Sequence, residues 1–147
     1  MEVKKVLLLA LLALSLFADG IIIKNSQNSV EKTVYILQNI VTKQGFTVYA
    51  IVDHQAGADK VRMQLPPSKE IIFGNPKAGT LLMQENMVAG LDLPIRILVF
   101  EDSDNRTKIA YRDGDWLAAE YNLTEKRVLN MMNFTLDNIT TEAGRTN

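Results

Sequence analysis

The chain has 147 residues, a formal net charge of −1 and no cysteine. Nucleic-acid binding needs a basic face that displaces counterions from phosphates, so the near-neutral charge argues against a nucleic-acid partner. The absence of cysteine excludes disulfide bonds, thiol catalysis and thiolate metal sites.

The first residues have the order of a secretory signal peptide. Lys4 and Lys5 precede an apolar or small run from Val6 to Phe17, and Ala18 then offers a small side chain for cleavage. The run is shorter than the roughly 20 apolar residues that a membrane-spanning helix needs. We therefore expect residues 1–18 to be removed as the protein is exported to the periplasm.

Residues 19–147 are then expected to form one periplasmic domain with no stable membrane insertion. Loss of Glu2, Lys4 and Lys5 changes the formal net charge to −2. Leu16 stands at the third position before the cut, where a small residue is usual. An uncleaved signal anchor that tethers the protein to the membrane is therefore the alternative.

The first half of this domain predicts a strand, a helix and a second strand. Ile21 to Lys24 is a β-branched run, and Asn28 followed by Glu31 resembles the capping box of a helix. The helix then carries an apolar stripe and ends at a glycine: Val30, Val34, Leu37, Val41 and Gly45. Phe46 to Asp53 alternates, with one face made by Phe46, Val48, Ala50 and Val52.

The second half predicts three more strands and two more helices, after an ambiguous segment from Gln55 to Pro67. The strands are Glu70 to Phe73, Ile95 to Phe100 and Lys108 to Tyr111, of which the last two form a hairpin through Asp102 to Asn105. The helices run from Lys77 or Thr80 to Val88, and from about residue 124 to 140, with frayed residues 143–147 after them.

Five strands and three main helices predict an α+β fold, a two-layer sandwich with helices packed on one face of the sheet. The alternation in the first half leaves a parallel doubly wound sheet open as an alternative. We favour a mostly antiparallel sheet, because the alternating strand from Phe46 to Asp53 implies one solvated face and parallel strands are usually buried on both faces.

The segment from Ser29 to Leu123 resembles the family catalogued as domain of unknown function 302. The resemblance runs through Phe46 to Ala58, Leu65-Pro66-Pro67, the stretch from Ile72 to Met83, Leu91 to Val99, Glu101-Asp102, Tyr111 and Trp116-Leu117-Ala118. It implies a fold like that of the TATA-box-binding-protein repeat, a curved antiparallel sheet backed by helices, in single domains that can pair as homodimers. No activity is established for the family, so the resemblance implies no catalytic residue, and the C-terminal helix lies beyond the matching motifs.

The loop from Gly74 to Thr80 is the first candidate for a ligand site. Its spacing approaches that of a phosphate-binding loop, but the lysine required before the threonine is missing, which argues against nucleotide hydrolysis. Free N–H groups at the start of the following helix could still hold a small anion, with Asn75, Lys77 and Gly79 taking part. The structural alternative is a tight turn in which Thr80 caps the helix.

His54 and Asp92 complete the set of candidate ligand-binding residues. His54 follows Asp53, but neighbouring residues on a strand point to opposite faces, so this pair is not expected to touch. We identify no catalytic triad, paired carboxylates, dinucleotide loop or local group of metal ligands. We therefore predict no cofactor and no metal, and we favour a protein that is not an enzyme.

Three functions follow in order of preference. The first is a small-ligand-binding or accessory module that uses the loop from Gly74 to Thr80 for a small anion or metabolite. The second is a dimeric structural or partner-binding protein without a small-molecule site. The third is a hydrolase-type enzyme that uses His54 with a carboxylate.

Overall fold

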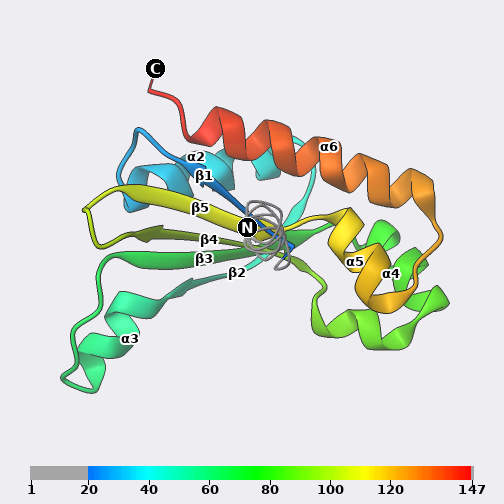
Figure 1. Ribbon diagram of the computed structural model, residues 1–147, viewed down its shortest axis with the longest axis horizontal. Coiled ribbons are helices and arrows are strands. Elements are labelled where there is room, and N and C mark those ends of the chain that lie inside the picture. The colour runs from blue at the N-terminus through cyan, green and yellow to red at the C-terminus, as the bar shows by residue number, and fades with distance from the viewer. Residues whose placement is uncertain (1–19, 147) are drawn as a thin grey trace, which may run out of the picture.

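The computed structural model describes residues 20–146. The predicted signal peptide and Asn147 lie outside the described residues. The elements in chain order are β1 (Ile21–Asn25), α2 (Val30–Lys43), β2 (Thr47–Asp53), α3 (His54–Lys60), β3 (Ser68–Gly74), α4 (Pro76–Glu85), the 3-10 helix η2 (Met87–Leu91), β4 (Ile95–Glu101), β5 (Thr107–Arg112), α5 (Gly114–Tyr121) and α6 (Lys126–Ala143) (Figure 1).

The strands form one five-stranded sheet in the order β1-β5-β4-β3-β2, and every neighbouring pair is antiparallel. The sheet is curved and open, which confirms the predicted α+β class and rejects the parallel alternative. The hairpin of β4 and β5 is also confirmed, with Ile97 opposite Tyr111 and Glu101 opposite Thr107.

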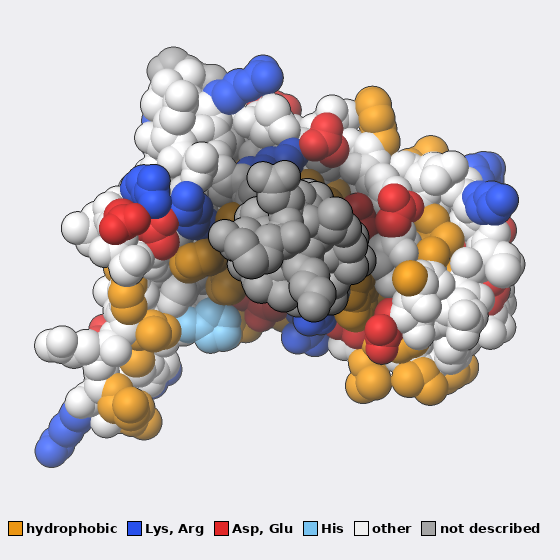
Figure 2. Space-filling view, viewed as in Figure 1, with side chains coloured by type: hydrophobic (Ala, Val, Ile, Leu, Met, Phe, Trp, Pro, Cys, Tyr) orange, Lys and Arg blue, Asp and Glu red, His pale blue; other side chains and the backbone are white. Residues whose placement is uncertain are grey.

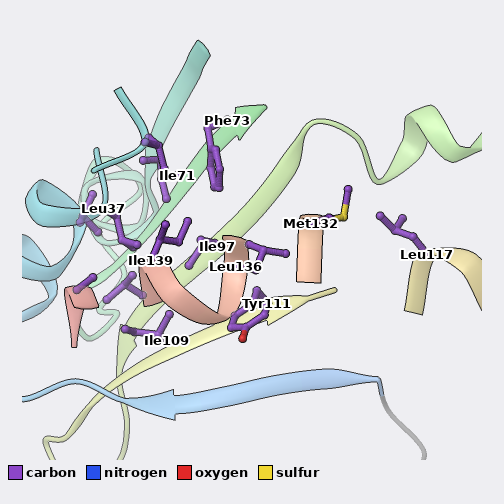
Figure 3. Close-up of a cluster of buried hydrophobic side chains, with 14 of the residues drawn as sticks. Leu37, Ile71, Phe73, Ile97, Ile109, Tyr111, Leu117, Met132, Leu136 and Ile139 are labelled. Carbon is purple, nitrogen blue, oxygen red and sulfur yellow. The ribbon is translucent and has the colours of Figure 1, made fainter. Parts of the chain in front are cut away.

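One face of the sheet holds the hydrophobic core. Alternate residues of the three central strands point to this face, where the apolar stripes of α2 and α6 cover them. The side chains that meet in the core are shown together in Figure 3: Leu37 of α2, Ile71 and Phe73 of β3, Ile97 of β4, Ile109 and Tyr111 of β5, and Met132, Leu136 and Ile139 of α6. All nine are buried.

Helix α2 confirms the predicted apolar stripe but begins one residue later than expected. Ser29 is the N-cap, and its side chain accepts a hydrogen bond from the backbone N–H of Lys32. Asn28 is instead buried, and its amide donates to the carbonyl oxygens of Ala143 and Arg145. The tail was predicted to fray from residue 143, which is wrong for Ala143 and Gly144, because both are buried against this segment.

Strand β2 departs from the predicted alternation. A β-bulge lies between Val48 and Ala50, so that Val48 stands opposite Phe73 on the core face, while Val52 stands opposite Glu70 on the other face. A bulge adds one residue and reverses the alternation beyond it. The prediction that Val48 and Val52 share a face is therefore wrong.

The ambiguous segment after β2 contains α3, which has no buried residue. Figure 1 shows α3 extending away from the sheet, at the end opposite α4 and α5. Exposed apolar side chains follow α3, namely Val61, Met63 and Leu65. Figure 2 shows apolar side chains gathered at this end of the molecule and at the opposite end, where α4 and α5 lie. None of the helices in residues 20–146 is long and apolar enough to cross a membrane.

Candidate functional site

A cavity of about 500 Å³ lies where α4, α6, the start of β2 and the segment before β4 meet. Volumes of this size are typical of sites for small molecules. Its lining residues are Phe46, Tyr49, Gly74 to Leu81, Met83, Leu93, Pro94, Ile95, Arg127, Val128, Met131, Met132 and Thr135. The predicted loop from Gly74 to Thr80 therefore forms one wall, and the first two turns of α6 form another.

The lining divides into an apolar floor and a more polar rim. Met132 is buried, and Leu81, Leu93 and Val128 are half-buried, so these side chains form the floor. Lys77 and Arg127 are exposed and stand at the rim. They are the charged members of the lining among residues 20–146, and neither forms an ion pair within that range.

The start of α4 explains how the loop is built. Asn75 is the N-cap, and its side-chain oxygen accepts from the backbone N–H groups of Lys77 and Ala78. Pro76 occupies the first helical position, where its lack of an N–H costs nothing. The hydroxyl of Thr80 donates to the carbonyl of Pro76, one turn back. The expectation that Thr80 caps the helix is therefore wrong, because the helix begins four residues before it.

This capping changes the predicted anion site. The backbone N–H groups that were expected to hold an anion are those already bonded to Asn75, and Pro76 supplies none. Lys77 remains the group of this loop that can attract a negative charge. The two glycines differ: a Cβ on Gly74 would lie 3.3 Å from Cβ of Pro94, whereas a Cβ on Gly79 would meet nothing within 4 Å.

Glu85 fixes the two helical walls relative to each other. It ends α4, and its carboxylate accepts hydrogen bonds from the backbone N–H and hydroxyl of Thr124 and from the backbone N–H of Glu125, just before α6. The bonds from Thr124, with a smaller one from Glu125, hold the pKa of Glu85 below its ordinary value. Helix α6 has no side-chain N-cap of its own, and the N–H groups that Glu85 binds precede its first turn.

His54 lies outside the cavity. It follows β2 at the end that pairs with Lys69, whereas the loop follows the other end of β3, at Gly74. A strand of seven residues separates these ends by about 20 Å. Nε2 of His54 is 3.9 Å from a carboxylate oxygen of Glu70.

The prediction that Asp53 and His54 do not touch is confirmed by the partners of Asp53. Its carboxylate caps α3 by accepting from the backbone N–H of Ala56 and lies 3.4 Å from the ammonium group of Lys69. The hydrogen bond from Ala56 is the main reason that the pKa of Asp53 is lowered.

Asp92 belongs to a different cluster. The hydroxyl of Tyr121 donates to its carboxylate, and the guanidinium of Arg112 approaches it at 3.3 Å while lying over the ring of Trp116. The hydrogen bond to Asp92 raises the pKa of Tyr121 to about 12. A smaller hollow of about 280 Å³ adjoins this cluster, with Glu70 and Arg96 in its lining.

Sequence reasoning thus found one wall of the cavity and missed the others. Phe46 and Tyr49 were predicted only as strand residues, and Arg127 and Met131 only as part of the helix from about residue 124 to 140. Met131 of α6 is 64% exposed and lines the cavity. Among residues 20–146, no three His, Asp or Glu side chains gather as ligands for a metal ion.

The fold and site together define a single-sheet α+β domain with a mainly apolar cavity at one end. The family described as "Domain of unknown function DUF302" matches residues 22–139, and the chain belongs to that family. The match includes most of α6, which lay beyond the motifs read from the sequence. The crystal structure of an uncharacterized conserved DUF302 protein from Bacillus stearothermophilus is similar in fold, with a TM-score of 0.68, 16% identity, and coverage of 86% of this chain and 97% of that chain.

Longer relatives occur in Brucella. The protein named fluoride-specific ion channel FluC 1 from Brucella suis is 39% identical over 109 residues, which are 74% of this chain and 43% of that protein. Fluoride-specific ion channel FluC 2 from Brucella melitensis is also 39% identical, over 40% of its length. The chain therefore spans less than half the length of these relatives.

Proposed function

We propose that this protein is a small-molecule-binding module and that its ligand occupies the cavity between α4 and α6. The observation that carries the proposal is the cavity itself: about 500 Å³, with an apolar floor that is open to solvent at a polar rim. A concave apolar site with a few polar groups is the usual form of a ligand pocket. Glu85 supports such a site, because it ties the two helical walls together.

Binding is favoured over catalysis by the chemistry of the lining. General acid–base catalysis needs a side chain with a suitable pKa beside the substrate, most often His, Asp or Glu. The cavity lining, taken over the described residues, has none of these three, and its own titratable side chains are Tyr49, Lys77 and Arg127. His54, on which the hydrolase hypothesis depends, stands at the opposite end of β3 and is 43% exposed.

Gly79 offers a direct test of the cavity. It lines the cavity, and a Cβ added there would meet no atom of the neighbouring elements within 4 Å, so we expect the side chain of Gly79→Leu to enter the cavity and leave the fold intact. Leucine is also the better helix former by roughly 0.8 kcal/mol, so the variant should melt at least as high as the wild type. Gly57→Leu in α3 is the matched control, because Gly57 is also helical and open but lies outside the cavity.

The measurement is a thermal-shift screen of small anions and metabolites on all three proteins, since a ligand that binds the folded state raises the melting temperature. The proposal expects hits that stabilise the wild type and Gly57→Leu but not Gly79→Leu. Hits that stabilise all three proteins equally would place the ligand elsewhere. A broad screen with no hit on the wild type would count against a small-molecule site.

Export to the periplasm is part of the proposal. Its support is the lysine, apolar and small-residue order of residues 1–18. N-terminal sequencing of protein from the native host should find a start at Asp19. Soluble cytoplasmic protein that retains residues 1–18 would refute export, and retention in the membrane fraction would indicate the uncleaved anchor.

A dimeric partner-binding protein is the second candidate, and the second face of the sheet favours it. Helices α2 and α6 pack on the core face, whereas Ile21 and Ile23 of the edge strand β1, on the other face, are 46% and 59% exposed. Exposed apolar sheet residues are candidates for an interface. Light scattering at micromolar concentration should give the mass of a homodimer that Ile23→Glu reduces to a monomer. A monomeric wild type would exclude this dimer.

The names of the Brucella relatives suggest a partner for which this protein could act as an accessory module. The chain resembles part of proteins named as fluoride-specific ion channels, so a membrane channel for fluoride is a candidate partner. Deletion of the gene in its native host should then lower the fluoride concentration that stops growth. Unchanged fluoride tolerance would remove this partner without affecting the cavity.

A further inference from the structure

Resting on the proposed ligand-binding function, we infer that the ligand is an amphiphilic monocarboxylate, an acid of the fatty-acid type. Its carboxylate lies at the rim with Lys77 and Arg127, and its apolar chain lies on the floor of the cavity. The inference depends on the sign of the charges at the rim, on which hydrogen-bond donors are free there, and on the chemistry of the floor.

The rim carries two positive charges, and no acidic side chain among the described residues lines the cavity to neutralise them. Lys77 lies in the first turn of α4, and Arg127 lies in the first turn of α6. The positive end of the helix dipole does not favour a cation at either place, and of the two cations in the first turn of α6 it is Arg127, not Lys126, that lines the cavity. The nearest described acid that joins the two helices, Glu85, is directed to the backbone of Thr124 and Glu125. An anionic ligand accounts for both cations.

The start of α4 does not offer the backbone donors of a phosphate site, and the side-chain donors at the rim suit a carboxylate. Protein sites for phosphate commonly use several backbone N–H groups at a helix start. At α4 the N–H groups of Lys77 and Ala78 are bonded to Asn75, and Pro76 has none. At the start of α4 the remaining donor is the side chain of Lys77, and across the cavity the planar guanidinium of Arg127 matches the two oxygens of a carboxylate.

The floor requires an apolar chain on the same molecule. Its side chains include Leu81, Met83 and Met132, and thioether side chains adapt readily to flexible apolar ligands. An anion without such a chain would leave this surface in water, and an apolar molecule without a charge would leave Lys77 and Arg127 without a partner. The charged group of an amphiphile also keeps its hydration at the open rim.

Isothermal titration calorimetry of the full chain tests the inference with four probes: dodecanoate and dodecyl phosphate below their micelle concentrations, 1-dodecanol below its solubility limit, and acetate. The proteins are the wild type, Lys77→Met, Arg127→Met and the control Lys126→Met, which removes an exposed cation next to Arg127 that does not line the cavity. Methionine keeps the length of the side chain and removes the charge.

Dodecanoate should bind the wild type about tenfold more tightly than dodecanol, and acetate should not bind measurably. Each of Lys77→Met and Arg127→Met should weaken dodecanoate about tenfold, a value between those for an exposed ion pair and a buried charge-assisted hydrogen bond. The same changes should leave dodecanol unchanged, and Lys126→Met should behave as the wild type. Circular dichroism melts of each variant verify that the fold is intact.

The outcomes separate this inference from the function on which it rests. Equal affinity for dodecanoate and dodecanol, or no effect of either substitution, would overturn the acid while leaving an apolar-ligand site. Tighter binding of dodecyl phosphate than of dodecanoate would overturn the carboxylate assignment. Failure of all four probes, together with a screen without hits, would remove the cavity as a ligand site altogether.

Discussion

Replacement of Leu37 by alanine tests whether α2 is held on the sheet by its apolar stripe. Leu37 is fully buried, and α2 packs against β3, β4 and α6. The change removes about three carbon groups, each worth about 0.8 kcal/mol of transfer free energy, or about 2.4 kcal/mol in all. A residual cavity adds to this, because a close-packed core relaxes only in part, so the expected loss is about 3–5 kcal/mol.

Urea denaturation followed by circular dichroism measures this loss as a difference in the free energy of unfolding. A domain of this size is stable by about 5–15 kcal/mol, so the variant should still fold. Gln38→Ala is the control, because Gln38 is the next residue on the same helix and is exposed. The free energy of unfolding of Gln38→Ala should stay within about 0.5 kcal/mol of the wild-type value. A loss below about 1 kcal/mol for Leu37→Ala would show that α2 does not pack on the sheet as described.

Three further predictions concern helices α4 and α5 and their contacts with neighbouring elements. Gly114→Ala places a Cβ 2.5 Å from the carbonyl oxygen of Leu129, so it should lower the free energy of unfolding by about 1–3 kcal/mol; an unchanged value would mean that α5 and α6 do not cross closely. The lowered pKa of Glu85 means that its stabilisation is present above the pKa of the unfolded chain and is lost as pH falls through the folded value. Glu85→Gln should therefore lower the melting temperature at pH 7, and the difference in melting temperature between variant and wild type should shrink as the pH falls. A difference that stays constant with pH would contradict the role of the carboxylate. The phenol of Tyr121 should titrate near pH 12 by ultraviolet absorbance, and Asp92→Asn should return its pKa towards 10. Because the folded pKa is raised, the stabilisation from Tyr121 is present below pH 10 and disappears as pH rises through about 12.

Local patterns predicted most of the secondary structure. The apolar run of β4, the acidic turn after it and β5 are neighbours in the chain, so their pairing needed no long-range information. The stripe of α2 was equally clear. Helix α3 was missed because none of its residues is buried, and a helix without an apolar stripe has no periodicity to detect. The bulge in β2 has no local signature, since it depends on the pairing with β3.

The cavity shows the same limit for function. The loop from Gly74 to Thr80 was recognised from its glycines, and it does line the cavity. His54 and Asp92 were grouped with it because they also border strands. His54 lies at the other end of β3, however, and Asp92 is bound to Tyr121 and Arg112. Arg127 joins the site only through the fold, since 50 residues separate it from Lys77. A single sequence does not indicate which distant residues converge on one cavity.

The junction between Asn28 and the end of α6 joins two segments of the chain that are synthesised far apart in time. The amide of Asn28 is bonded to Ala143 and Arg145, and the backbone N–H of Gln27 is bonded to the carbonyl of Gly144. These partners leave the ribosome more than 100 residues after Asn28, which at about 5–20 residues per second is a delay of several seconds or longer. During that interval β1 and the entrance to α2 lack their closing contacts. This late closure is compatible with the export proposed above, because a chain that has not closed can still cross a membrane in the unfolded state.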